Sequence, residues 1–162
     1  MKSVSLSAFP RNQSRRKGAR AVRANGRIPA VIYGGQNKPE TLEVIDRDIE
    51  NLIHHSVSEN VLVDLTVGGT QASRLALVQD VQHHPLTQKI LHLDLHEVKP
   101  DEKVTIMVPV EAEGEAAGVK TGGGTLEHVR FKLKVRALPK DLPEALIVDV
   151  SKLEIGQSIH IG

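Results

Sequence analysis

Aromatic and thiol side chains are scarce in this sequence, which holds no cysteine, no tryptophan, one tyrosine and two phenylalanines. Because cysteine is absent, the chain has no disulfide framework, no thiolate zinc finger, no iron–sulfur cluster and no cysteine nucleophile. Its aromatic residues, Phe9, Tyr33 and Phe131, are too few for the base-stacking platform of an RNA-recognition motif or a cold-shock fold. Stacking on single-stranded nucleic acid is therefore excluded as the main mode of binding.

Long apolar runs are also lacking. The chain has no stretch of about 18 apolar residues that could span a membrane, and no apolar h-region precedes its first arginine, Arg11. We therefore expect neither a membrane span nor a signal peptide, and a protein that stays in the cytosol. The composition, 40% hydrophobic and 25% charged over 162 residues, is typical of a folded protein with one domain or two small ones.

Acidic residues are missing from residues 1–39, although this segment holds nine lysines and arginines. The rest of the chain holds 12 basic and 20 acidic residues, so the net charge of +1 hides a strongly basic N-terminal quarter. Such segregation of charge indicates a polyanionic partner, and the alternative is a solvated charged arm.

The patterning of the first hundred residues predicts a β-rich structure with few helices. Alternation of apolar and polar residues, bounded by glycine and proline, predicts strands at 3–9, 28–35, 61–67, 72–81 and 90–98. Helix-compatible segments lie at 13–27 and 46–55. If the first segment is helical, one face carries Arg16, Arg20, Arg23 and Arg27 with no acidic neighbour, although Gly18 weakens its first turn.

A polar, proline-bearing segment at 97–102 predicts a domain boundary. Beyond it we expect a strand at 103–114, a glycine-rich loop at 115–125, a strand at 128–138 and further short strands toward the end. In the 128–138 strand, the inward residues are Val129, Phe131, Leu133 and Val135, and the outward residues are Arg130, Lys132, Lys134 and Arg136.

The eight histidines do not have the spacing of a metal or hydrolase site. Adjacent pairs such as His83 and His84 do not face one ligand, so we interpret them as structural or surface residues. His92 and Asp94 share one strand face, but no G-x-S-x-G serine accompanies them, which favours a polar binding surface or a solvated face. The run G-V-K-T-G-G-G-T at 118–125 lacks the order of a phosphate-binding loop and is interpreted as a flexible loop.

Several separated motifs carry a family resemblance that reaches from Val4 to the last residue. R-x-x-x-R-R-K-G-A-R-x-x-R-x-x-G-x-I-P-A-V-I-Y-G-G (11–35), Q-D-V-Q-H-H-P (79–85) and H-L-D-L (92–95) resemble the N-terminal domain of the twenty-fifth protein of the bacterial large ribosomal subunit. V-P-V-E-A-E-G-E-A-A-G-V-K-T-G-G-G (108–124), L-P-x-x-L-P-E (138–144) and L-E-I-G-Q-S-I-H-I (153–161) resemble the extra domain of its longer Ctc, or general stress protein, form.

This resemblance implies a mainly β fold, with a closed six-stranded β-barrel and short helices at 1–96. That domain is expected to bind 5S ribosomal RNA at its loop E helix and to help stabilise the central protuberance. The second β-rich domain, 97–162, is expected to lack a final strand and tail and to contact neighbouring ribosomal proteins and 23S rRNA. Carried over by position, the RNA contacts fall on Arg11, Arg16, Arg20, Arg23, Tyr33, His92 and Asp94. At a position where that family often has a small hydroxyl residue, this chain has Ala19.

We therefore expect a ribosomal component with no catalytic residues, no metal and no cofactor. Two alternatives come from other classes: a small hydrolase or metalloprotein using His92 and Asp94, and a stress-induced protein-interaction module independent of RNA. For the cationic stripe at 130–136 we expect no primary role in 5S RNA binding. Residues 97–162 hold nine basic and eleven acidic residues, so nearby acids should satisfy or screen that stripe, the outer face of an amphipathic strand.

Overall fold

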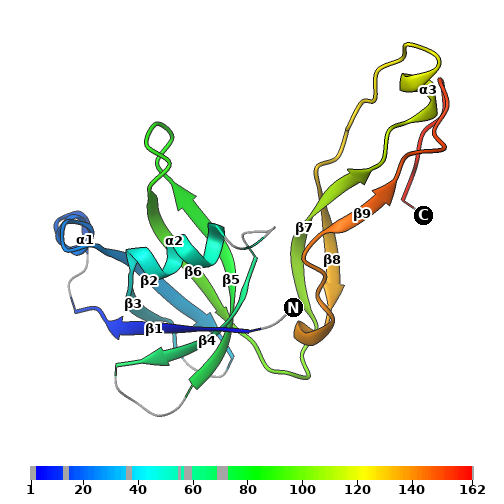
Figure 1. Cartoon of the computed structure of the whole chain (residues 1–162). Coiled ribbons are helices and arrows are strands. Elements are labelled where there is room, and N and C mark those ends of the chain that lie inside the picture. Colours follow the sequence, from blue (N-terminus) through cyan, green and yellow to red (C-terminus); the bar gives the residue numbers. More distant parts are fainter. Residues whose placement is uncertain are drawn as a thin grey trace.

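A computed structural model describes residues 3–12, 15–35, 38–54, 56, 60–68 and 73–161. The described part consists of a closed barrel, β1 to β6, and a three-stranded sheet, β7 to β9, with short helices (Figure 1). The strands are β1 (Val4–Pro10), β2 (Arg27–Gly34), β3 (Glu40–Ile45), β4 (Leu62–Val67), β5 (Ser73–His83), β6 (Ile90–Glu97), β7 (Val104–Glu113), β8 (Lys132–Ala137) and β9 (Leu146–Asp149). The helices are α1 (Arg15–Ala24), α2 (Asp46–His54), α3 (Ala117–Lys120) and the 3-10 turn η1 (Pro139–Asp141).

The barrel closes in the strand order β1-β3-β2-β6-β5-β4, which confirms the predicted six-stranded barrel. Two pairings, β1 with β4 and β2 with β6, are parallel, and the other four are antiparallel. The parallel pairs join strands far apart in the sequence, with Leu6 opposite Leu65 and Tyr33 opposite His96. The residue pattern did not predict β3, because its six residues place only Leu42 and Val44 in the interior.

Alternate strand residues fill the barrel interior. Ile32, Val44, Leu65 and Leu95 are at most 2% exposed, and Ile49 of α2 joins the same core. Each such side chain contributes roughly 1.5–3 kcal/mol relative to leaving it in water. Because the apolar residues point inward, the outer face of the barrel wall can carry polar residues. Among the described helices, none is long and apolar enough to cross a membrane.

The second sheet, in the order β8-β7-β9, shares a hydrophobic core with the outside of the barrel. We call this cluster the seam; its buried members are Leu62 and Leu77 of the barrel together with Val98, Val104, Ile106, Val108 and Leu142. Beside it the Asn60 side-chain amide donates a hydrogen bond to the Met107 carbonyl oxygen (2.7 Å). The seam therefore packs the first half of β7 against β4 and β5.

The strand predicted at 128–138 is shorter in the structure, where β8 begins at Lys132. Val129 and Phe131, predicted to point inward, are 78% and 67% exposed, so that prediction is wrong. Only the later residues Val135 and Ala137 pack against the seam, because the seam covers only that end of the sheet. The alternation of inward and outward residues holds along β8 itself. The segment before β8, which includes Val129, has no buried surface to pack against.

The glycine-rich segment at 115–125 also differs from the expected loop, since residues 117–120 form α3. Its glycines allow backbone to pack on backbone: the Gly118 N–H donates to the Leu153 carbonyl oxygen (2.9 Å), and a Cβ at Gly118 would lie 2.8 Å from the Ile155 nitrogen. Of the further short strands expected after residue 138, the described residues form only β9, and 153–161 is not a strand.

Candidate nucleic-acid interface

Helix α1 forms as predicted and lies against β2 of the barrel (Figure 1). Gly18 and Val22, four residues apart, are buried on its inner side, so the glycine that weakened the prediction lies where the helix packs. Arg16 and Arg20 are exposed, one helical turn apart. No carboxylate among the described residues pairs with either guanidinium. The helix thus presents two solvated cations.

The last two arginines of the predicted face behave differently. The Arg23 guanidinium donates to the Leu91 carbonyl oxygen (2.9 Å), which ties the end of α1 to β6. Arg27 lies outside the helix, which ends at Ala24, and it opens β2. It forms an ion pair with Glu43 and lies over the Phe9 ring, 4.5 Å from the ring centroid. The predicted four-arginine face without an acidic neighbour is therefore wrong at Arg27.

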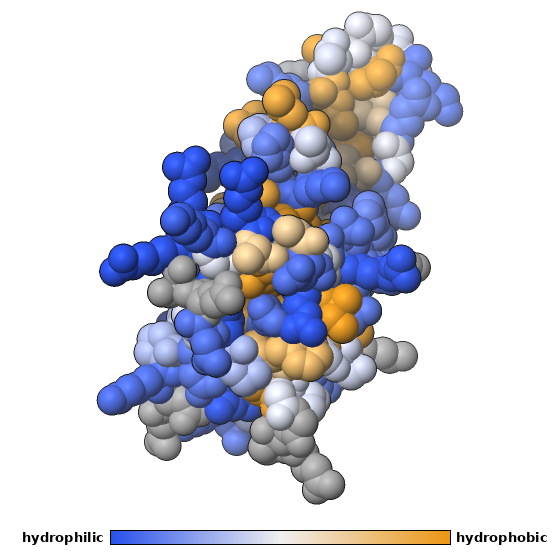
Figure 2. Space-filling view, turned by 90° about the vertical axis from the view of Figure 1, so that its left-hand side faces the viewer, coloured by the Kyte–Doolittle hydropathy of each residue, from blue (hydrophilic) through white to orange (hydrophobic). Residues whose placement is uncertain are grey.

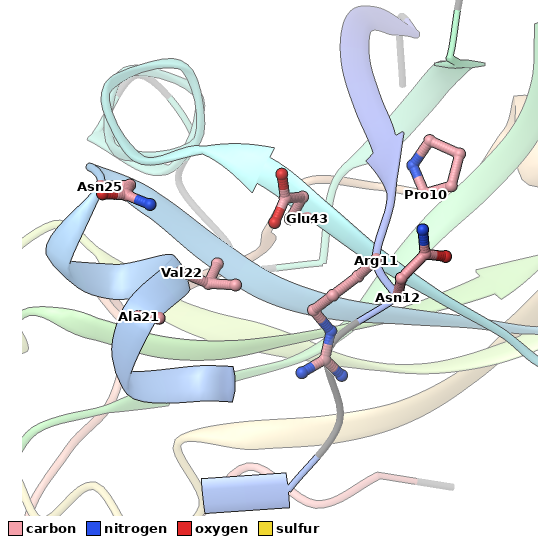
Figure 3. A pocket seen from close by; sticks show the side chains of 7 residues that line it. All are labelled: Pro10, Arg11, Asn12, Ala21, Val22, Asn25 and Glu43. Atoms are coloured by element: carbon pink, nitrogen blue, oxygen red, sulfur yellow. The ribbon is translucent and has the colours of Figure 1, made fainter. Parts of the chain in front are cut away.

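Arg11 lines a cavity of about 290 Å³ between the end of β1 and α1. Figure 3 shows Arg11 and Asn12 on one side of this cavity and Ala21, Val22 and Asn25 on the other. The backbone N–H of Arg11 donates to the Thr41 carbonyl oxygen (3.0 Å), which fixes the chain at this point. Its Nε is buried and has no hydrogen-bond partner among the described residues.

A polar face on the outer wall of the barrel holds the other predicted contacts. His92 Nδ1 lies 2.7 Å from Asp94 Oδ1, and both side chains are partly exposed, at 28% and 29%. On the adjacent strand Tyr33 contacts His96 edge to face, with ring centroids 5.6 Å apart. Gly34 permits this close approach, because a Cβ there would lie 2.8 Å from His96 Nε2. Strands β2 and β6 therefore present fixed polar groups side by side.

Burial and two nearby carboxylates raise the pKa of the Tyr33 phenol above 10.0. Burial is the larger cause, followed by the negative charges of Asp94 and Asp80, since both effects disfavour the phenolate. At neutral pH Tyr33 is consequently a neutral group that can donate or accept a hydrogen bond.

The strand register adds two residues that the sequence reasoning did not select. Asp80 lies opposite Asp94 and Gln82 lies opposite His92 on the neighbouring β5. Both are exposed. Both residues belong to the Q-D-V-Q-H-H-P motif, which could have indicated them. Their position beside His92 and Asp94 follows only from the pairing of β5 with β6, which includes register shifts.

The histidines and carboxylates of the described residues do not cluster as a metal site requires. No group of three or more histidine, aspartate or glutamate side chains in the described part of the chain could hold a metal ion. His84 has a structural role, because its Nδ1 accepts from the backbone N–H groups of Leu86 and Thr87 (3.3 Å each). His54 ends α2, and the adjacent His55 lies outside the described residues.

The predicted contacts therefore fall into two groups that α1 connects. Arg23 places the helix next to His92 through the neighbouring Leu91 carbonyl, whereas Arg11 lies on the side of α1 that faces β1 and β3. Figure 2, which views the side where α1 lies in Figure 1, shows strongly hydrophilic side chains projecting into solvent. The chemistry is that of a rigid binding surface for a polyanion, with cations at its edge and hydrogen-bonding groups beside them.

Fold and site together define a β-barrel protein whose surface suits a polyanionic partner. Comparison with known proteins shows which one: residues 6–95 match the Ribosomal L25p family, and residues 103–162 match the C-terminal domain of ribosomal protein TL5. The chain belongs to the Ribosomal L25p family.

Relatives named large ribosomal subunit protein bL25 match nearly the whole chain. The protein of Desulfatibacillum aliphaticivorans is 38% identical over 162 residues, which are 100% of this chain and 74% of the relative. That of Porphyromonas gingivalis is 40% identical over 162 residues, covering 100% and 82%. That of Syntrophobacter fumaroxidans is 41% identical over 160 residues, covering 98% and 80%.

Membership in this family makes the chain a structural component of the large ribosomal subunit, with ribosomal RNA and ribosomal proteins as partners. It is not an enzyme, and as part of the ribosome it acts in the cytoplasm. The hydrolase and RNA-independent alternatives are thereby set aside.

Proposed function

We propose that the barrel binds 5S ribosomal RNA at the loop E helix and so helps to stabilise the central protuberance of the large subunit. The observation that carries this proposal is the juxtaposition of α1 with the polar face of β2 and β6. Arg16 and Arg20 are exposed on that helix without a carboxylate partner among the described residues, and Arg23 anchors it beside the His92–Asp94 pair. A cationic edge next to a rigid hydrogen-bonding face suits a structured RNA helix.

The two groups of residues have different roles in this proposal. Arg16 and Arg20 are exposed cations at the surface and take phosphates, which gives affinity and orientation with little sequence dependence. Tyr33, His92 and Asp94 are fixed on strands and meet ribose hydroxyls and base edges, which the shallow minor groove of A-form RNA exposes. Arg11, which is partly buried, adds a further guanidinium on the other side of α1.

We further propose that residues 1–96 form the RNA-binding domain and residues 97–162 a second domain. Two observations support this division: the barrel ends with β6 at Glu97, and the two family matches stop at residue 95 and start at residue 103. Because Leu62 and Leu77 of the barrel lie in the seam, separating the halves would expose apolar surface. Experiments on RNA binding therefore use the full chain.

The test is a titration of the full chain with two RNAs at the same salt concentration. One is a 5S rRNA fragment containing the loop E helix, and the other is a fully paired duplex of equal length. We expect clearly tighter binding to the loop E fragment, because the fixed polar face recognises its irregular geometry. Equal affinity for the two RNAs, or no loss of affinity for either on changing Asp94 and His92 to alanine, would contradict the proposal.

A further inference from the structure

The outer face of the second sheet separates its charges along the strands. Register places Arg136 beside Thr105, Lys134 beside Met107 and Lys132 beside Pro109. Farther along β7, Glu113 lies beside Asp149 of β9. One end of this face is therefore cationic and the other acidic, although the sum over residues 97–162 is close to neutral.

We call Lys132, Lys134 and Arg136 the β8 cations. All three are exposed, and no carboxylate among the described residues pairs with them. The expected satisfaction of this stripe by direct ion pairs is therefore absent for these three among the described residues, whereas its screening by nearby acids stays a prediction. Arg130 is left out of the set, because it precedes the strand on the side of the acidic end.

Distance along the sheet shows how little the acids of β7 can screen the β8 cations. Counted along the strand from Glu111, the partner of Lys134 is four residues away and the partner of Arg136 is six, which is roughly 13 and 20 Å. The Debye length is about 8 Å at physiological ionic strength. The acids of β7 therefore take little from the positive potential of Lys134 and Arg136, and Lys132 lies nearest the acidic end.

The spacing of the β8 cations suits the RNA backbone. Successive outward residues on a strand are roughly 7 Å apart, which is similar to the separation of neighbouring phosphates along one RNA strand. Their neighbours on the same face, Thr105, Met107 and Pro109, carry no charge, so nothing on this part of β7 repels a phosphate. The seam fixes the other face of the same strands, where Ile106 and Val108 are buried.

We propose that the β8 cations form a second RNA-binding surface, which takes the phosphates of a ribosomal RNA helix other than the one bound by α1. An RNA helix is favoured over an acidic protein segment, because the cations form a row along one strand at about the spacing of successive phosphates. The proposal does not depend on the 5S assignment, since it concerns a different surface.

The experiment uses the full chain with Arg16→Gln and Arg20→Gln, which weakens the α1 surface. In this background we compare Lys132→Gln/Lys134→Gln/Arg136→Gln with a matched control, Lys99→Gln/Lys120→Gln/Lys152→Gln. Each set removes three exposed positive charges from the second half of the chain. The probe is a fully paired RNA duplex without loop E, titrated at several salt concentrations.

We expect the β8 set to lower affinity at least tenfold and to reduce the salt slope by roughly 0.7 to 0.9 for each phosphate that the protein no longer neutralises. The control set should change affinity less than threefold. Equal effects of the two sets would show that net charge alone matters, and no effect of the β8 set would show that the surface does not bind RNA. Either result overturns the proposal, as would equally tight binding of a polyglutamate peptide to the β8 cations.

A second measurement separates this proposal from the 5S assignment. In the chain with α1 intact, the β8 set should leave affinity for the loop E fragment unchanged within about twofold. If α1 variants fail to affect loop E binding while the β8 set still affects the duplex, the 5S assignment is wrong and the second surface remains.

Discussion

At the scale of single residues, the polar face gains its properties from neighbours on adjacent strands. Tyr33 comes from β2, Asp94 from β6 and Asp80 from β5, so three strands determine the charge state of one phenol. The contact of His92 Nδ1 with Asp94 Oδ1 holds the His92 imidazole in place. Each group is held by the barrel before RNA arrives, which reduces the entropic cost of binding.

Tyr33 provides a direct test of this environment, because it is the only tyrosine in the sequence. Its phenolate absorbance during an alkaline titration should give a midpoint above 10.0, and Asp94→Asn should lower that midpoint by removing a negative charge. Because the native pKa is raised, the stabilising contribution of this group is complete below pH 10.0 and is lost as pH rises through the native pKa. A midpoint unaffected by Asp94→Asn would refute the charge coupling.

Asp94 should discriminate between RNAs more than it contributes to overall affinity. We expect Asp94→Ala to cost on the order of 1–3 kcal/mol for the loop E fragment and little for a plain duplex. Isothermal titration of both RNAs measures the difference. The exposed Asp101→Ala serves as a control for charge, since it removes a carboxylate that lies outside β6. Equal losses on both RNAs would show that Asp94 does not read RNA shape.

At the scale of elements, α1 and β8 are two cationic elements that differ in how they are tethered. One side of α1 is buried and Arg23 ties its end to β6, whereas β8 pairs along its whole length with β7. Both leave their remaining cations in solvent, so each is suited to phosphates rather than to reading bases.

Changing Arg16 or Arg20 to alanine should weaken binding to every RNA and reduce the dependence of affinity on salt. The expected reduction in slope is roughly 0.7 to 0.9 for each phosphate left without its arginine. Arg47→Ala on α2, which is also exposed, is the matched control and should leave the slope unchanged. The proposed role of α1 fails if the control alters the slope as much as Arg16→Ala does.

Local pattern explains which elements were predictable from the sequence. Helix α1 and strand β6 were predicted because their patterns are visible within about ten residues, as with the alternation of Leu93 and Leu95 with Asp94 and His96 in β6. The ion pair of Arg27 with Glu43 was not, since it depends on β2 pairing with β3, a strand that the pattern missed. The exposure of Phe131 likewise depends on where the seam ends, which no local pattern encodes.

At the scale of the whole molecule, the seam makes the barrel and the second sheet share one core. Leu77 of the barrel and Ile106 of the second sheet are each at most 1% exposed within it. The residues of the candidate site were selected through family resemblance and remain a prediction, whereas the connection between the halves was not predicted at all. It required three-dimensional packing between residues 60–77 and 98–142.

Leu77→Ala should therefore destabilise both halves. A large-to-small change at a buried leucine costs roughly 2–5 kcal/mol, and the loss should appear as faster amide hydrogen exchange in β7 and β8 as well as in β5. Leu93 lies in the barrel core but outside the seam, so Leu93→Ala is the comparison. It should speed amide exchange in the barrel strands more than in β7 and β8. Unchanged exchange in β7 after Leu77→Ala would show that the two halves unfold independently.

The parallel pairings of the barrel set the order in which a growing chain can acquire this binding surface. Strand β2 pairs with β6, so Tyr33 meets Asp94 and His96 only after roughly sixty more residues have been synthesised. Strand β1 likewise can pair with β4 only after β4 has been synthesised. Contacts this distant in sequence slow folding and postpone it until most of the barrel has emerged. During that interval the nascent N-terminal segment carries its full positive charge without a barrel behind it, so specific recognition begins only when β6 closes the wall.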